Sequence, residues 1–327
     1  MTAADRPVLL RARDVVKHFP VRSSRGRAKD VVHAVDGVSL EVRAGESLGL
    51  VGESGCGKST LGRCLVGLTP LTSGSVELDG QEISAMSARA LRPIRREMQM
   101  VFQDPYASLN PRKRIESIIG LTLGSDRTAR STRVRELLEL VGLRAEHARR
   151  FPHEFSGGQR QRIGIARALA PDPRLIVADE PVSALDVSIQ AQVVNLFADL
   201  QDKLGLAYVF IAHDLSVVRQ ISDRIAVMYL GKIVEVGPGE NVVHKPMHPY
   251  TEALLSSVPS PVVSRRARRE RIVLQGDVPS PVSPPSGCRF HPRCRYSTQR
   301  CVDEEPLLIQ RGPHGQAAAC HYPLSDG

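Results

Sequence analysis

The chain has 327 residues, 42% of them apolar, so it can bury one large core or two modest ones. Its net charge of +9 suits an anionic partner, but aromatic residues are only 4% and tryptophan is absent, which leaves few stacking platforms for single-stranded nucleic acid. No apolar run reaches the roughly 18 residues that a bilayer requires, and Met1–Pro7 lacks a signal-peptide pattern. We therefore expect a cytosolic chain, for which other subunits would supply any membrane path.

Apolar patterning predicts an α/β organisation. A strand-rich region extends to about Glu82 and includes a turn at Asp79–Gly80, and a core strand follows near Met98–Phe102. The next section is mainly helical, as in Val134–Val141, where apolar residues recur at helical spacing. Strands then alternate with helices through Val236, which implies crossover connections and a mostly parallel sheet.

A glycine-rich loop lies inside the N-terminal region. The apolar run Leu48–Val51 predicts a buried strand before it, and Ser59–Leu68 predicts a helix after it. In this order backbone N–H groups surround phosphate oxygens, Lys58 reaches the β and γ phosphates, and a hydroxyl, that of Ser59, holds Mg²⁺. We therefore expect a nucleoside triphosphate site rather than a turn without a ligand. Its residues are Gly52, Glu53, Ser54, Gly55, Cys56, Gly57, Lys58, Ser59 and Thr60.

Cys56 is an unusual residue for such a loop. It stands beside phosphate-binding N–H groups at a helix start, an environment that can lower the pKa of a thiol and make it oxidisable. The sequence thus suggests that alkylation of Cys56 blocks ATP binding.

A Ser-Gly-Gly-Gln sequence follows about a hundred residues later, inside His153–Arg162. Ser156, Gly157 and Gly158 can open a helix over Gln159–Leu169, whose first turn would present bare N–H groups and a positive dipole end to a phosphate. Taken alone, the glycine pair is better explained as a plain helix start, so its role toward phosphate depends on the other motifs.

An acidic pair ends the next apolar run, Arg174–Glu180. If that run is a parallel strand, Asp179 and Glu180 emerge at its carboxyl end, where α/β sheets bind ligands. Asp179 could then bind Mg²⁺, directly or through water. Glu180 could orient or deprotonate the water that attacks the γ-phosphate. An isolated Asp-Glu at a strand end is more often a solvated turn, so this role depends on the glycine-rich loop.

These motifs, in this order, resemble the ATP-binding cassette (ABC) family. The resemblance implies an ABC-type P-loop nucleotide-binding domain over 1–245, with a mostly parallel sheet core, an antiparallel β subdomain and a helical subdomain at about 104–165. A C-terminal extension with cysteines would occupy 246–327. In this family two cassettes pack head to tail, so that the signature Ser156, Gly157, Gly158 and Gln159 of one closes on ATP held by the phosphate loop of the other.

The resemblance also assigns roles that the residues alone do not. Gln103 would sense the γ-phosphate, contribute to the Mg²⁺ site and couple to a permease helix, and Asp186 would belong to the loop that follows the acidic pair. His213 would contact the γ-phosphate and the catalytic water, and Lys58 would assist catalysis. Phe19 resembles the aromatic residue that stacks on adenine, with a buried core phenylalanine as the alternative.

The C-terminal residues 246–327, here called the tail, resemble one subgroup of the ABC family. His248–Thr251, followed by Leu254–Leu255 and a proline-rich stretch, is similar to the tail of ATPases from peptide importers, a group that also serves nickel and related small solutes. The resemblance implies an ATPase at the cytoplasmic face of the membrane. Its partners would be a second cassette, two permease subunits and an extracytoplasmic solute-binding protein, with no nucleic acid.

Four of the six cysteines, Cys288, Cys294, Cys301 and Cys320, lie in this tail. Because stable disulfides are disfavoured in the cytosol, clustered thiols indicate a metal or redox site, and four thiolates suit Zn²⁺ or a [4Fe–4S] cluster. The gaps lack the paired knuckles of zinc ribbons, and some peptide-importer ATPases resemble this chain in carrying an iron–sulfur cluster. Zinc and unligated or oxidised thiols remain as alternatives. His291 and His321 are further ligand candidates, but exposed loop histidines are the preferred interpretation.

Three other functions fit the sequence less well than an importer. A soluble cassette ATPase acting on DNA or ribosomes would use the basic charge, but the coiled-coil insertion or second cassette of such relatives is missing. A P-loop kinase would not need Ser-Gly-Gly-Gln or His213, and the tail disfavours an exporter. A linker cluster, Arg265, Arg266, Arg268, Arg269 and Arg271, is typical of a solvated charge run, with anionic lipid as a lesser alternative. The sequence identifies neither the solute nor whether the partner cassette is a copy or a paralogue.

Overall fold

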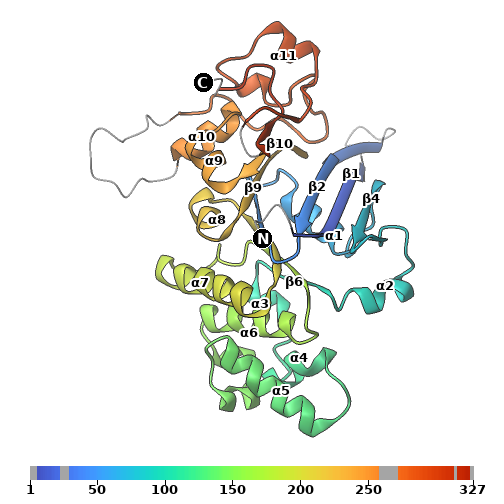
Figure 1. Ribbon diagram of the computed structural model, residues 1–327, viewed down its shortest axis with the longest axis vertical. Helices are drawn as coiled ribbons and strands as arrows, with labels where there is room; N and C mark the ends of the chain where they lie inside the picture. The colour runs from blue at the N-terminus through green and yellow to red at the C-terminus, as the bar shows by residue number, and fades with distance from the viewer. Residues whose placement is uncertain (1–5, 23–28, 258–271, 313–314, 325–327) are drawn as a thin grey trace. The chain divides into compact units, whose positions relative to one another are not determined.

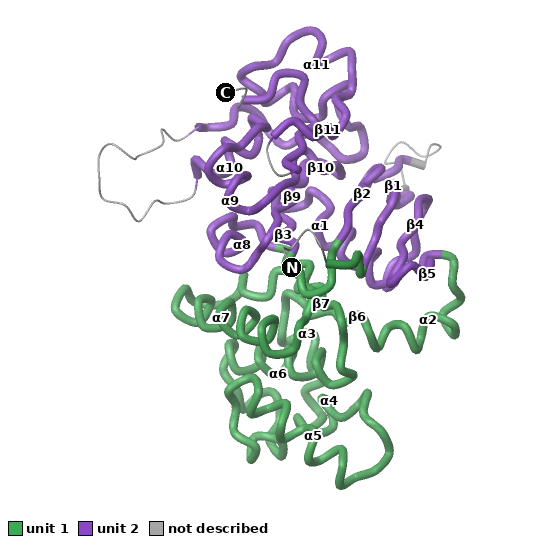
Figure 2. The backbone as a smooth tube through the Cα atoms, in the orientation of Figure 1, with its two compact units in different colours: residues 1–9, 42–47, 85–211 green, residues 10–41, 48–84, 212–327 purple. Residues whose placement is uncertain are grey.

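The computed structural model describes residues 6–22, 29–257, 272–312 and 315–324 (Figure 1). They form two compact units (Figure 2): unit 1 comprises residues 1–9, 42–47 and 85–211, and unit 2 comprises residues 10–41, 48–84 and 212–327. The arginine cluster at 265–271 and residues 1–5 lie outside the described residues.

Unit 1 contains three parallel strands. β6 (Met98–Val101) pairs with β7 (Leu175–Asp179), which pairs with β8 (Ala207–Ala212). Every residue of β7 and β8 is buried, as expected for parallel strands that are covered on both faces and therefore have continuous apolar sequences. The strands predicted near 98–102, 174–179 and 207–212 are confirmed.

Helices make up the rest of unit 1. α6 contacts α3, α4, α5, α7 and β6, and its Ile163 and Ile165 are fully buried. The helix predicted at 134–141 is the second half of α5. The helices are α2 (Ala88–Ile94), α3 (Pro105–Ser108), α4 (Ile115–Ile119), α5 (Arg127–Leu140), α6 (Gly157–Leu169) and α7 (Val187–Leu204), with short 3₁₀ turns η2 (Gly120–Thr122), η3 (Ala145–Arg149) and η4 (Pro152–Glu154).

Unit 2 contains a small sheet in the order β2-β1-β4-β5. Its strands are β1 (Val8–Arg22), β2 (Lys29–Arg43), β4 (Ser73–Leu78) and β5 (Gln81–Glu82), with β4 antiparallel to both β1 and β5. Asp79 and Gly80 both have positive φ, as the two-residue hairpin turn between β4 and β5 requires. The predicted turn and antiparallel subdomain are confirmed.

The other strands of unit 2 correct one prediction. β3 (Ser47–Val51) is parallel to β9 (Arg224–Tyr229), but β9 and β10 (Lys232–Pro238) form an antiparallel hairpin. Alternation of strand and helix does not continue through Val236, because Leu230 and Gly231 adopt positive φ and reverse the chain in two residues. β12 (Ala317–Ala318) and β11 (Ile309–Gln310) extend this edge antiparallel, so the sheet is mixed.

The C-terminal residues pack against β9 within unit 2. Tyr229 of β9, Tyr250 and Phe290 have ring centroids 4.7 to 5.4 Å apart, and all three side chains are essentially buried. The domain boundary at 245/246 stays a prediction. Among the described ranges, no helix is long and apolar enough to span a membrane. The described helices of unit 2 are α1 (Lys58–Leu65), α8 (Leu215–Ile221), α9 (Gly239–His244), α10 (Pro249–Ser257) and α11 (Gln299–Asp303), and the 3₁₀ turn η5 spans His291–Arg293.

Candidate functional site

The glycine-rich loop joins β3 to α1, as predicted. Lys58 is the first residue of α1 and is 4% exposed, and its Nζ donates hydrogen bonds to the carbonyls of Gly52 at 2.8 Å and Glu53 at 2.9 Å. Gly57 caps the helix at φ 107°, and a Cβ there would lie 1.9 Å from the carbonyl oxygen of Ala34. The loop is therefore curled so tightly that only glycine fits, with the lysine at the start of the helix and its bare N–H groups.

Cys56 does not behave as its sequence position suggested. It is 5% exposed, and burial raises the pKa of its thiol, although Lys58 Nζ lies 3.8 Å from its Sγ and favours the thiolate. The suggestion of a lowered pKa is wrong because loss of water outweighs the nearby positive charge. A buried, protonated thiol is a poor target for alkylation. The structure therefore does not favour alkylation of Cys56 as a way to block ATP binding.

Glu53 is held by two residues from the C-terminal part of the chain. Its carboxylate accepts hydrogen bonds from both terminal nitrogens of Arg293, at 2.7 and 3.2 Å. Its backbone N–H donates to the hydroxyl of Tyr250 at 2.8 Å. Sequence reasoning missed both contacts, since no spacing pattern relates residues about 200 positions apart.

In unit 1 the predicted carboxylates are placed as expected. Asp179 ends β7 and is 2% exposed, and Glu180 follows it at φ 45°. Left-handed backbone at a non-glycine residue is costly and occurs preferentially at functional sites. Glu180 Oε2 accepts a hydrogen bond from Gln103 Nε2 at 2.9 Å, so two residues predicted for the γ-phosphate are brought together. The sequence had not paired them.

The Ser-Gly-Gly-Gln sequence begins α6. Ser156 is the N-cap and shares a capping box with Gln159: the hydroxyl accepts from the Gln159 N–H at 3.4 Å, and Gln159 Oε1 accepts from the Ser156 N–H at 3.0 Å. A Cβ on Gly158 would lie 2.5 Å from Ile189 Cγ2 of α7, so this glycine permits close helix packing. The predicted helix start is confirmed, and its role toward phosphate stays a prediction.

The remaining predicted residues divide between the units. Phe19 is 38% exposed, with Lys17 Nζ 4.8 Å from its ring centroid, so the alternative of a buried core phenylalanine is wrong. His213 follows β8 and is exposed, and Asp186 is exposed at the start of α7. Phe19, the phosphate loop and His213 belong to unit 2. Gln103, the Ser-Gly-Gly-Gln sequence, Asp179, Glu180 and Asp186 belong to unit 1.

The four tail cysteines gather around one pocket in unit 2, with His291 and His321 beside them. All six cysteines of the chain are free thiols. Burial, and then proximity to the other tail thiols, raises the pKa of Cys288 to about 11, and burial raises that of Cys320 to about 11. The Cys288 N–H donates to the Cys301 carbonyl at 2.8 Å, which ties two distant cysteines together.

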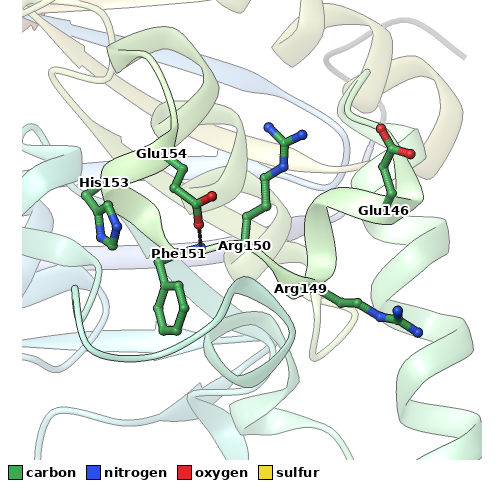
Figure 3. Close-up of a pocket in the computed structure, with 6 residues that line it drawn as sticks. All are labelled: Glu146, Arg149, Arg150, Phe151, His153 and Glu154. Atoms are coloured by element: carbon green, nitrogen blue, oxygen red, sulfur yellow. Dashed lines mark hydrogen bonds between the residues drawn. The ribbon is translucent and has the colours of Figure 1, made fainter.

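Unit 1 also has a shallow hollow of about 650 Å³ that contains none of the residues predicted for nucleotide (Figure 3). Its two arginines and two glutamates balance in charge, and the Phe151 N–H donates to Glu154 at 2.6 Å. The hollow is lined by Glu146, Arg149, Arg150, Phe151, His153 and Glu154.

Family models match two parts of the chain. Residues 35–183 match the model described as "ABC transporter", and residues 234–301 match "Oligopeptide/dipeptide transporter, C-terminal region". The first match includes the phosphate loop, Gln103, the Ser-Gly-Gly-Gln sequence and the acidic pair. The second includes most of β10, all of α10 and three of the four tail cysteines.

Curated relatives match along nearly the whole chain. The oligopeptide transport ATP-binding protein AppF of Bacillus subtilis is 53% identical, over 98% of this chain and 99% of its own length. The dipeptide transport ATP-binding protein DppF of Haemophilus influenzae is 50% identical, with 96% of each chain covered. Among solved structures, the dimeric post-hydrolysis state of the ATP-binding cassette MJ0796, bound to ADP and phosphate, matches with a TM-score of 0.64 and 28% identity, over 70% of this chain and 98% of that one.

Proposed function

Because this chain belongs to the ABC transporter ATPases, in the group of oligopeptide and dipeptide transport ATP-binding proteins, we propose that it hydrolyses ATP to drive uptake of peptides or related small solutes. The observation that carries the proposal is the combination, in one chain, of a phosphate loop organised around Lys58 with a C-terminal region that matches peptide transporters. Other subunits would form the membrane path.

ATP and Mg²⁺ would be bound chiefly by the phosphate loop. Lys58 is already buried among loop carbonyls and would reach the β and γ phosphates, while the Ser59 hydroxyl would hold Mg²⁺. Asp179 and Gln103 would complete the Mg²⁺ site, and the exposed ring of Phe19 would stack on adenine. Backbone N–H groups of residues 52–60 would surround the phosphate oxygens.

Glu180 would act on the attacking water. Gln103 donates to Glu180 Oε2 at 2.9 Å and so directs the carboxylate, which would orient the water or accept its proton. Gln103 would thereby link the γ-phosphate to the position of the base, and His213 would contact the γ-phosphate and the same water. Proton transfer by a positioned side chain typically contributes about 10² to 10⁴ in rate.

A second cassette would complete each nucleotide site. The N-terminus of α6, with Ser156, Gly157 and Gly158, would close on ATP bound by the partner's phosphate loop, with Gln159 and Asp186 nearby. The dimeric, ADP-bound structure of the cassette MJ0796 supports the pairing of two cassettes. Two permeases, an extracytoplasmic solute-binding protein and a paralogous or identical cassette would complete an importer, with this chain at the cytoplasmic face of the membrane and no nucleic acid bound.

We also propose that Cys288, Cys294, Cys301 and Cys320 hold a [4Fe–4S] cluster. The four thiols line one pocket and offer the ligand set of such a cluster, which would supply a structural cross-link or one-electron redox chemistry. Zinc held by the same four thiolates is the alternative.

Strictly anaerobic purification is expected to yield brown protein with about four iron atoms per chain. A Cys301→Ser variant should lose most of the iron, whereas Cys64→Ser, whose thiol is buried in α1 away from the tail, should retain it. Iron and acid-labile sulfide analysis measures this. Colourless, iron-free protein would overturn the cluster, and one zinc per chain would favour the alternative.

The importer itself is tested by isolating its assembly. A Glu180→Gln variant purified from its native membranes with MgATP is expected to bring two permeases, a second cassette and a solute-binding protein, identified by mass spectrometry. The solute-binding protein would then indicate the solute. Ribosomal proteins or DNA-bound factors without a permease would contradict the proposal and favour a soluble cassette ATPase.

A further inference from the structure

We propose that Arg293 is a positioning residue for the phosphate loop: by holding Glu53 it keeps the loop in its nucleotide-binding form, so the cysteine-rich segment sets the affinity for MgATP. This inference rests on the proposed function, because it assumes that residues 52–60 bind the nucleotide.

The ion pair between Arg293 and Glu53 is bidentate, and its arginine is buried. The Arg293 side chain is 8% exposed, and both of its terminal nitrogens bond the same carboxylate. Burial disfavours the charged guanidinium, but Glu53 more than offsets this, and the pKa of Arg293 is raised. A bidentate, water-shielded pair fixes direction as well as charge, whereas an exposed ion pair does not.

A second contact holds the same loop residue. The Glu53 N–H donates to the hydroxyl of Tyr250, which is fully buried and packs against Phe290. Phe290 lies three residues before Arg293 and also packs edge-on against Tyr229. Backbone and side chain of Glu53 are therefore both held by one aromatic-and-arginine cluster.

A third contact reaches the loop through a turn. Arg289 donates to the Leu230 carbonyl and pairs with Asp36, while the N–H of the next turn residue, Gly231, donates to the Cys56 carbonyl at 2.9 Å. Arg289, Phe290 and Arg293 all lie between Cys288 and Cys294. A segment bounded by two pocket cysteines thus contacts the loop directly and through the β9–β10 turn.

The negative charge of Glu53 explains why its pairing with Arg293 affects nucleotide binding. MgATP brings several negative charges to the loop, and an unpaired Glu53 carboxylate would repel them. Arg293 neutralises that carboxylate and keeps it bonded toward the C-terminal segment. Without Arg293, Glu53 would be both uncompensated and free to move, and the loop would lose the orientation of its carbonyls and N–H groups.

The test uses the full chain and MgATP, with dissociation constants from titration calorimetry and steady-state hydrolysis. Arg293→Met is expected to weaken MgATP binding about tenfold, within the usual range of coupling between sites, and to raise KM more than it lowers kcat. Arg295→Met is the matched control, since Arg295 pairs with Glu252 at an exposed site two residues away. It should leave affinity unchanged.

Rescue separates positioning from mere structural damage. Arg293→Lys keeps the positive charge but not the bidentate bond, so its affinity should fall between those of the wild type and Arg293→Met. Adding Glu53→Gln to Arg293→Met removes the unpaired charge and should recover part of the affinity, the remainder being the part lost with the Arg293–Glu53 hydrogen bonds. Equal affinity of Arg293→Met and Arg295→Met, or no recovery in the double variant, would overturn the inference. If the wild-type chain itself bound no MgATP, the proposed function would fail instead.

Discussion

Replacing Glu180 by glutamine is expected to lower kcat for ATP hydrolysis by at least about 100-fold while leaving MgATP binding intact. Glutamine keeps the shape of the side chain and one carbonyl oxygen, so the hydrogen bond from Gln103, 2.9 Å in the wild type, can persist. It cannot accept a proton from water. The loss should therefore fall on kcat, with a dissociation constant close to that of the wild type.

The measurement is single-turnover hydrolysis alongside equilibrium MgATP binding. Glu136→Gln is a suitable control, because Glu136 is an exposed residue of unit 1 that forms a surface ion pair with Arg133. It should retain wild-type kinetics. Near-normal turnover in Glu180→Gln would remove Glu180 from the role of base and leave its left-handed backbone without an explanation in catalysis.

Replacing Gly57 by alanine is expected to reduce MgATP affinity by about 100-fold or more, in keeping with the cost of small misplacements in binding sites. The added Cβ would lie 1.9 Å from the Ala34 carbonyl oxygen and 2.9 Å from Met228 Cε. The first contact is with backbone, which no rotamer change relieves. The loop would have to move away from β2, and α1 would start in a different place.

Gly55→Ala is the matched comparison for this change. Gly55 also has positive φ, but its added Cβ would meet nothing within 4 Å. Alanine there should cost only backbone strain of about 1–2 kcal/mol. Calorimetric titration should give Gly57→Ala a much lower affinity for MgATP than Gly55→Ala, with thermal unfolding of both variants as a check of folding. Equal affinities would mean that the loop tolerates displacement and that its tight curl is not required for nucleotide.

The local features of the nucleotide site could be predicted from the sequence. Glycines at 55 and 57, Lys58 at a helix start, and Ser156 as an N-cap are determined by backbone sterics and by the donors of a first helical turn, which involve near neighbours in the chain. The buried parallel strands could also be predicted, because strands covered on both faces need continuous apolar residues. The β9–β10 hairpin was missed, since Leu230 gives no signal of positive φ.

Tertiary structure alone decided how distant residues combine. Burial raised the pKa of Cys56 where the sequence suggested a lowered one, because desolvation depends on everything packed around the thiol. The bonds from Gln103 to Glu180 and from Arg293 to Glu53 join residues 77 and 240 positions apart. Sequence determined which groups this ATPase possesses, through short-range sterics and hydrogen bonding. Folding decided which of those groups meet, because side-chain contact and loss of water arise only when separate segments pack together.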